Sequence, residues 1–181
     1  SITYSYKQQL LSDLQELLQI PSVQGVPAPG APYGVETRRA LDFMLRRGAE
    51  LGFKTRDIDG HAGHVEYGER GPLIGILVHL DVVPAGDAWR HEPFGGTFED
   101  GCVYGLYSLR AFADAVPEPT VRIRIIFGLN EESGMAGVKH YFKHEPVPDY
   151  GFSPDAAYPL LNRESGIAHV FLRAGRDRKA E

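Results

Sequence analysis

The chain has 181 residues, which is enough for one domain with a sizeable hydrophobic core. Hydrophobic residues make up 43% of it and charged residues 24%, as in an ordinary folded protein. The net charge of −5 predicts no basic surface for nucleic acid or an anionic membrane, and the longest apolar run, residues 73–78, is too short to cross a bilayer. Cys102 is the single cysteine, which excludes an intramolecular disulfide, and the N-terminus shows no secretion signal. We therefore expect a cytoplasmic protein without nucleic-acid or membrane partners.

Two helices are predicted in the first third of the chain. Leucines recur at helical spacing over residues 10–18, and Pro21 ends that pattern. A second apolar helix face covers residues 36–51, and Gly52 stands where a C-terminal glycine cap belongs. The intervening residues 21–34 are rich in Pro and Gly and predict an exposed loop.

The rest of the chain predicts strands and short helices. Residues 73–78 are continuously apolar, which indicates a strand buried on both faces in the middle of a sheet. A later apolar run carries Arg122 and Arg124, which we expect on its more exposed face. The strands are expected at residues 53–58, 62–67, 73–78 and 121–127, a hairpin at 97–104, and helices at 107–115 and 135–143. This mixture predicts an α/β fold.

Two polar residues follow the apolar strand of residues 73–78. His79 and Asp81 are two positions apart, so both side chains leave the same face of an extended segment. A carboxylate beside a histidine fixes the tautomer and directs the free ring nitrogen towards a metal. In an open α/β sheet, ligands bind at the carboxyl ends of the strands, and this segment is such an end.

Further carboxylates follow the next two apolar segments. Glu131 and Glu132 come after the strand at 121–127, and Asp155 follows the short apolar segment Tyr150-Gly151-Phe152. Neighbouring side chains point in different directions, so one glutamate can bind a metal while the other handles a proton. Imidazole and carboxylates without a thiolate suit zinc or another borderline divalent ion in hydrolytic work. The residues therefore predict a metal site at one edge of the sheet.

Several motifs, in this order, resemble the dizinc aminoacylase and dipeptidase family, which includes acetylornithine deacetylase, succinyl-diaminopimelate desuccinylase and carboxypeptidase G. The similarity is closest to bacterial dipeptidases that act on Xaa-His and related dipeptides. The motifs are His79-Leu80-Asp81-Val82-Val83-Pro84, Pro93-Phe94-Gly95-Gly96, Asp100-Gly101, Tyr104-Gly105, Asn130-Glu131-Glu132-Ser133-Gly134 and Ser153-Pro154-Asp155. The resemblance implies a three-layer catalytic domain, in which helices flank a central mixed sheet, over residues 1–172. It also implies that a charged tail, residues 173–181, leads towards a lid domain absent from this chain.

The resemblance also implies a role for each site residue. His79 resembles a ligand of one zinc, with Asp155 as its carboxylate partner, and Glu132 resembles a ligand of the second zinc. Glu131 resembles the general base that deprotonates the bridging water, and Asp81 the carboxylate that holds His79 in place. Two zinc ions per complete enzyme are implied, with manganese or cobalt as substitutes.

The sequence departs from the family pattern after Tyr104-Gly105. There the family has an Arg-Gly and then an Asp-Lys-Gly segment whose Asp bridges both metals, whereas this chain continues with Leu106. The distal histidine of the second zinc and the lid are absent as well, and Asp114 is a poor substitute for the bridging Asp. We interpret the sequence as the joined ordered pieces of a longer, metal-poor enzyme. The alternative is a truncated, internally deleted protein, but deleting a helix start beside a buried strand would expose apolar surface.

The predicted function is zinc-dependent hydrolysis of dipeptides, with a small peptide as partner. One alternative is an amidase of the same family that removes an acyl group from an amino acid, and another is a non-catalytic relative that has lost the metals. The sequence predicts no oligomeric state. The remaining histidines show no carboxylate partner at ligand spacing, so we expect them at the surface or behind the site: His61, His64, His91, His140, His144 and His169.

Overall fold

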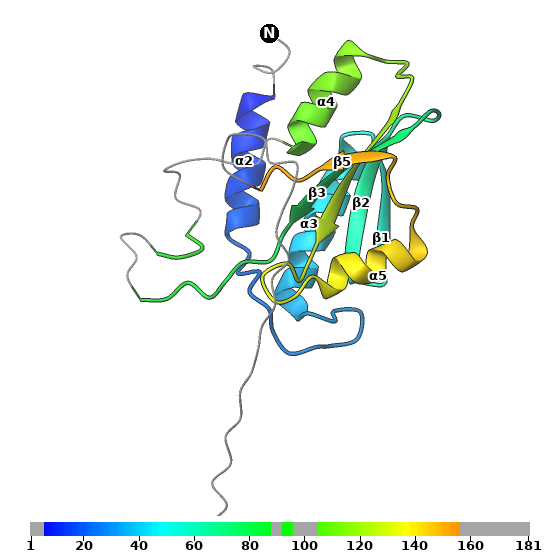
Figure 1. Ribbon diagram of the computed structural model, residues 1–181. Helices are drawn as coiled ribbons and strands as arrows, with labels where there is room; N and C mark the ends of the chain where they lie inside the picture. Colours follow the sequence, from blue (N-terminus) through cyan, green and yellow to red (C-terminus); the bar gives the residue numbers. More distant parts are fainter. Residues whose placement is uncertain (1–5, 88–91, 96–104, 156–181) are drawn as a thin grey trace, which may run out of the picture.

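The computed structural model describes residues 6–87, 92–95 and 105–155 of the chain (Figure 1). Its helices are α2 (Lys7–Leu18), α3 (Val35–Glu50), α4 (Gly105–Ala115) and α5 (Ala136–His144), and its strands are β1 (Lys54–Ile58), β2 (Ala62–Tyr67), β3 (Leu73–His79), β4 (Arg122–Gly128) and β5 (Tyr150–Phe152). Among these residues, no helix has the length and apolar character needed to cross a membrane. The predicted hairpin at 97–104, Cys102 and the predicted tail at 173–181 lie outside the described residues.

The five described strands form one mixed sheet in the order β1-β2-β4-β3-β5. The strands β1, β2 and β4 are antiparallel neighbours, whereas β3 runs parallel to both β4 and β5. β4 is the middle strand, and β3 lies inside the sheet between β4 and β5, as its apolar run predicts, with side chains packed against both cores. Its burial is less complete than predicted. Only Leu73 and Gly75 of β3 are buried, because its outer neighbour β5 has just three residues, all of them exposed.

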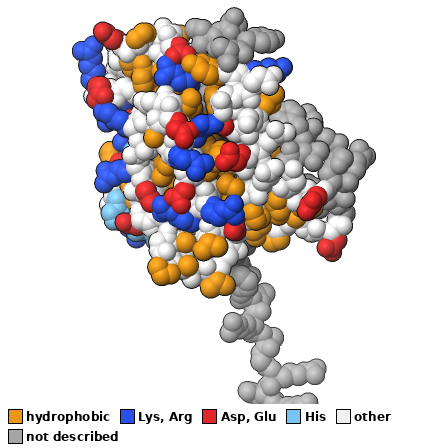
Figure 2. Space-filling model, turned by 180° about the vertical axis from the view of Figure 1, so that it is seen from behind, with side chains coloured by type: hydrophobic (Ala, Val, Ile, Leu, Met, Phe, Trp, Pro, Cys, Tyr) orange, Lys and Arg blue, Asp and Glu red, His pale blue; other side chains and the backbone are white. Residues whose placement is uncertain are grey.

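Helices cover both faces of the sheet, which confirms the predicted three-layer α/β arrangement (Figure 1). On one face, α2, α3 and α4 pack around a large apolar core to which β4 contributes Ile125 and Phe127. On the other face, Tyr141 of α5 packs against Ile126 and Ala62. Alternation of side chains along β4 supplies both cores from one strand. The outer surface of α3 carries ion pairs such as Arg38–Asp42. In the view from behind, basic and acidic side chains lie side by side (Figure 2).

The prediction that Arg124 lies on an exposed face is wrong. Arg124 is 5% exposed beneath α5, where it forms ion pairs with Glu66 at 2.6 Å and with Glu145 at 2.8 Å. Arg124 also donates a hydrogen bond to the hydroxyl of Tyr141. Alternation along the strand correctly separates this face from the apolar one, but α5 closes over it. Two carboxylates make the burial of the guanidinium tolerable.

Candidate functional site

Three strand ends meet at one edge of the sheet. Because β3, β4 and β5 are parallel, their carboxyl ends lie at the same edge, which is where ligands gather in open α/β sheets. His79 is the last residue of β3, the Glu131–Glu132 pair follows β4 after two residues, and Asp155 lies three residues beyond β5. The topology thus delivers the predicted site residues to one place from distant parts of the chain.

His79 lies at the centre of this group. Its Nε2 atom is 3.1 Å from a carboxylate oxygen of Asp155, and one ligand atom each from His79, Glu131 and Glu132 lie within 4.8 Å of one another. On the other side of the ring, Nδ1 is 2.8 Å from the main-chain carbonyl oxygen of Asp81. A carbonyl oxygen only accepts, so Nδ1 carries a hydrogen and Nε2 is left to face the carboxylates.

The carboxylate of Asp81 contacts the two glutamates more closely than it contacts His79. One of its oxygens accepts the backbone N–H of Glu131 at 3.1 Å, and the other accepts that of Glu132 at 3.2 Å. Its distance to Nδ1 of His79 is 3.6 Å, an ion-pair contact. Asp81 is 1% exposed. Its burial raises the pKa of this carboxyl, but the interactions with His79 and with the two N–H groups outweigh that effect and lower it. Asp81 therefore joins the end of β3 to the turn after β4.

The charge of His79 depends on the same neighbours. The Asp81 carboxylate, followed by its carbonyl and the Asp155 carboxylate, raises the pKa of His79 to about 9 against the opposing effect of burial. Without a cation, the ring is consequently protonated at neutral pH and pairs with the carboxylates. A divalent ion held between Nε2 and the carboxylates would take the place of that proton.

Asn130 shapes the turn that carries the glutamates, and sequence reasoning did not identify it as a site residue. It is buried, its side-chain oxygen accepts the N–H of Ala136 at the start of α5, and its side-chain nitrogen donates to Gln24. Met135, with φ 58°, donates its N–H to the carbonyl of Asn130. An asparagine that opens a turn before a helix is a recognisable capping signal, although the contact with Gln24 has no local signature.

The segment at residues 21–34 is not the fully exposed loop that its composition predicts. Ser22, Ala31 and Tyr33 are buried, and the Ser22 hydroxyl donates to the carbonyl of Leu80 at 2.6 Å. The N–H of Val82 in turn donates to the Ser22 carbonyl. The loop therefore packs on the segment that carries His79 and Asp81, because the polar groups on both sides find partners there.

Asp114, the nearest carboxylate to the family's missing bridging Asp, does not join the site. It lies near the end of α4, where it pairs with Arg110 and accepts a hydrogen bond from Tyr6. In the described part of the chain, the group at the strand ends therefore consists of His79, Asp81, Glu131, Glu132 and Asp155.

Two of the histidines differ from the expectation that they lack a carboxylate partner and lie at the surface or behind the site. Nε2 of His140 is 3.0 Å from a carboxylate oxygen of Asp59, which is 81 residues away in sequence, so spacing could not reveal the pair. His64 is buried and contacts Tyr141. His91 and His169 lie outside the described residues.

Comparison with known proteins identifies relatives of the chain. The model of peptidase family M20/M25/M40 matches residues 75–173. Putative dipeptidase YtjP of Bacillus subtilis (strain 168) is 40% identical over 181 residues, which cover 92% of this chain and 39% of that protein. The chain thus spans about two fifths of the length of this relative.

Solved structures share the fold. Human carnosine dipeptidase 1 superimposes with a TM-score of 0.69 at 21% identity, covering 86% of this chain and 40% of the other. The YXEP protein of Bacillus subtilis, described as a dinuclear metal binding peptidase, gives a TM-score of 0.55 at 19% identity, covering 77% of this chain and 40% of that one. At these identities the likeness concerns the fold alone.

Proposed function

The chain belongs to peptidase family M20/M25/M40, and from this membership we propose that it supplies part of the active site of a metal-dependent dipeptidase. The observation that carries the proposal is the convergence of His79, Glu131, Glu132 and Asp155 at the carboxyl ends of three parallel strands. The dipeptidase name of the relative that is 40% identical supports the choice of a small peptide as substrate.

The donor groups at this edge fit a borderline divalent ion. His79 presents Nε2, fixed by the contact of Nδ1 with the Asp81 carbonyl, to a carboxylate at 3.1 Å. Two more carboxylates lie within reach, and an imidazole with carboxylates suits zinc, manganese or cobalt. We assign His79 and Asp155 to one ion and Glu132 to a second. The chemistry that such ions supply is Lewis-acid polarisation of the peptide carbonyl.

Glu131 has the position of a general base. Its carboxylate lies beside His79 and Glu132, and it is half-buried, so its oxygens face the same space as the proposed ligands. In the proposed reaction, a carboxylate oxygen of Glu131 takes a proton as water attacks the peptide carbon. It then gives that proton to the departing amine nitrogen as the C–N bond breaks, which leaves Glu131 ionised for the next cycle.

Asp81 has a positioning role in this proposal. It holds the backbone of both glutamates through their N–H groups, so the proton acceptor and the ligand keep a fixed relation to His79.

The experiment compares Glu131→Gln with His79→Ala in the purified protein supplied with zinc, manganese or cobalt. Dipeptides and N-acyl amino acids are offered as substrates in parallel. We expect hydrolysis of dipeptides and a loss of about 100-fold or more in kcat for Glu131→Gln, with its metal content unchanged. We expect His79→Ala to lose metal as well as activity, and Asp42→Asn, an exposed carboxylate on α3, to change neither. Full activity in Glu131→Gln, or metal binding by His79→Ala equal to that of the unaltered protein, would contradict the proposal.

A further inference from the structure

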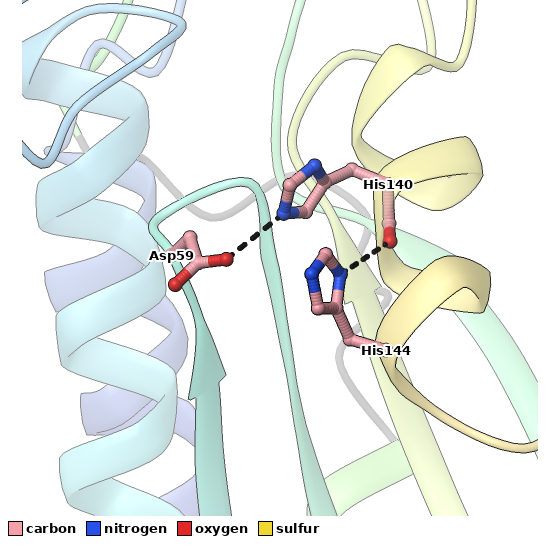
Figure 3. Close-up of side chains that lie close together, drawn as sticks. All are labelled: Asp59, His140 and His144. Carbon is pink, nitrogen blue, oxygen red and sulfur yellow. Dashed lines mark hydrogen bonds and ion pairs between the residues drawn. The ribbon is translucent and has the colours of Figure 1, made fainter.

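A second group of metal-ligand side chains lies on the α5 side of the sheet (Figure 3). Asp59 comes from the turn between β1 and β2, and His140 and His144 come from α5. One ligand atom from each residue lies within 4.8 Å of the others, and Nε2 of His140 is 3.0 Å from the Asp59 carboxylate. The group shares no residue with the site at the strand ends. Ala62, three residues after Asp59, and His79 both pair with Gly128, so these two backbone positions are about two strand spacings, roughly 10 Å, apart.

The two elements that carry this group are held firmly against each other. A Cβ atom on Gly137 would lie 2.4 Å from the carbonyl oxygen of His61, so α5 packs directly on the turn at a position that only glycine allows. The ring of His61 stacks on that of His140 with centroids 3.9 Å apart, and the Tyr33 hydroxyl holds His61 from behind at 2.8 Å. The ligand groups therefore meet without a large rearrangement of the chain.

The hydrogen bonds of the two histidines decide which nitrogens are free. Nδ1 of His144 is 3.1 Å from the main-chain carbonyl of His140, which can only accept, so Nδ1 carries the hydrogen and Nε2 offers a lone pair. His140 and His144 are one helical turn apart and share one face of α5. Nε2 of His140 faces the Asp59 carboxylate, and the hydrogen bond between them lowers the pKa of Asp59, so the carboxylate is ionised.

We propose that Asp59, His140 and His144 form a second cation site that takes a borderline divalent metal such as Zn²⁺ or Ni²⁺. In a tetrahedral site with ligand bonds of about 2.0–2.2 Å, neighbouring ligand atoms lie about 3.3–3.5 Å apart. The separation between His140 and Asp59 is 3.0 Å and the others are no more than 4.8 Å, so rotation of the side chains can bring the ligand atoms to that spacing. The cation replaces the proton between His140 and Asp59. Asp59 and His144 are exposed, so the remaining coordination positions are open to water or to a ligand from outside.

Occupation of this site has a structural consequence. The bound cation ties the turn after β1 to the C-terminal half of α5, the helix whose N-terminal end follows the Glu131–Glu132 turn. Such a bridge stabilises the packing of α5 because the cation binds the folded arrangement and not the unfolded chain.

The test titrates Zn²⁺ into the protein with His79→Ala and Glu132→Gln, which removes ligands proposed for the first site. Calorimetry at pH 7.5 is expected to show one remaining equivalent of bound zinc. Adding Asp59→Asn or His144→Gln should weaken that binding about tenfold or more, and adding both His140→Gln and His144→Gln should abolish it. Adding Asp42→Asn, which alters an exposed carboxylate of α3, should leave it unchanged. Zinc should also raise the melting temperature of the variant with His79→Ala and Glu132→Gln. It should not do so once His140 and His144 are replaced as well.

Native mass spectrometry of the unaltered protein gives a second measure that does not depend on the first site being removable. His140→Gln with His144→Gln should lower the maximum number of bound zinc ions by one and leave the peptidase site loaded. The inference is overturned if zinc binding is the same with and without these two histidines, or if His79→Ala with Glu132→Gln abolishes all zinc binding in a folded protein. Either result leaves the proposed peptidase function untouched, since that function rests on separate residues.

Discussion

Replacement of Asp81 by asparagine removes one charge from the centre of the candidate site without changing its shape. In the native chain, both oxygens of the carboxylate accept backbone N–H groups, from Glu131 and Glu132, and the same group lies 3.6 Å from Nδ1 of His79. Asparagine keeps one acceptor oxygen, but its NH₂ group faces the other N–H and cannot accept from it. The substitution thus leaves one donor unpaired and removes the anion that stabilises the protonated His79 ring.

The cost has two parts with different pH dependence. A hydrogen bond to a charged group is worth about 1.5–3 kcal/mol, and this loss is present at every pH at which Asp81 is ionised. The rise in the pKa of His79 from 6.5 to about 9 corresponds to at most about 3.4 kcal/mol, of which Asp81 supplies the largest share, roughly 1–2 kcal/mol. Because the folded pKa is raised, this second part is fully present below pH 6.5 and disappears as the pH rises through 9. We expect a total loss of about 2.5–5 kcal/mol at pH 6 and about 1.5–3 kcal/mol at pH 9.5.

Urea denaturation in the presence of EDTA, at pH 6 and at pH 9.5, separates the two parts. Asp42→Asn is the matched control, since it removes an exposed carboxylate paired with Arg38 and should cost less than about 1 kcal/mol. If Asp81→Asn unfolds within about 0.5 kcal/mol of the native chain at pH 6, the described hydrogen bonds do not hold the turn. An equal loss at both pH values would refute the assignment of the His79 charge to Asp81.

Three further predictions concern α5 and the sheet beneath it. Burial lowers the pKa of His64 to about 3 in the folded chain, whereas the residue titrates near 6.5 in the unfolded chain. Acidification from pH 7 to pH 5 should therefore lower the free energy of unfolding by about 2 kcal/mol through this residue. Denaturation of His64→Gln at both pH values should not show this loss. Arg124→Met should lower the unfolding free energy by about 3–5 kcal/mol in the same assay, because the half-buried Glu66 and the buried Glu145 both lose their ion pair with Arg124. A loss no larger than that of an exposed arginine would contradict the buried ion pairs. Gly137→Ala should cost about 1–3 kcal/mol in thermal melts through its clash with the His61 carbonyl. Gly105→Ala should be neutral, because its Cβ would lie no closer than 3.8 Å to the neighbouring atoms that the structure describes. Equal effects of the two substitutions would refute the close packing of α5 on the turn.

The convergence of the site residues could be predicted from the sequence because each one follows an apolar strand. The runs that end at His79 and at Phe127 are long enough to indicate buried strands, and parallel strands place their carboxyl ends at one edge. The short apolar segment Tyr150-Gly151-Phe152 predicted that Asp155 reaches the same edge of the sheet. The segment forms β5, and Asp155 lies beside His79. The motif resemblance then gave the family, which the family match to residues 75–173 confirms.

The predictions that proved wrong all depend on contacts between segments that are far apart in sequence. Alternation along β4 shows that Arg124 shares a face with Ile126, but whether that face meets water depends on where α5 packs. The pairing of Asp59 with His140 depends on the same packing. Composition predicted an exposed loop at residues 21–34, whereas Ser22 finds partners on the strand-end segment. Local propensity cannot report such partners, because they exist only once the layers have assembled.

Helix α5 is the element on which these long-range contacts converge. At its start, Asn130 accepts the N–H of Ala136, so the same residue that shapes the glutamate turn also sets the first turn of the helix. Along its length, Gly137 and His140 pack on the β1–β2 turn, and just beyond its end Glu145 reaches the buried Arg124. The position of Glu131 and Glu132 is therefore fixed from two directions, by Asp81 through their N–H groups and by α5 through Asn130. A cation bound between Asp59 and α5 would stabilise the packing of α5, and with it the position of Asn130. The two proposed metal sites are thus connected through this one helix.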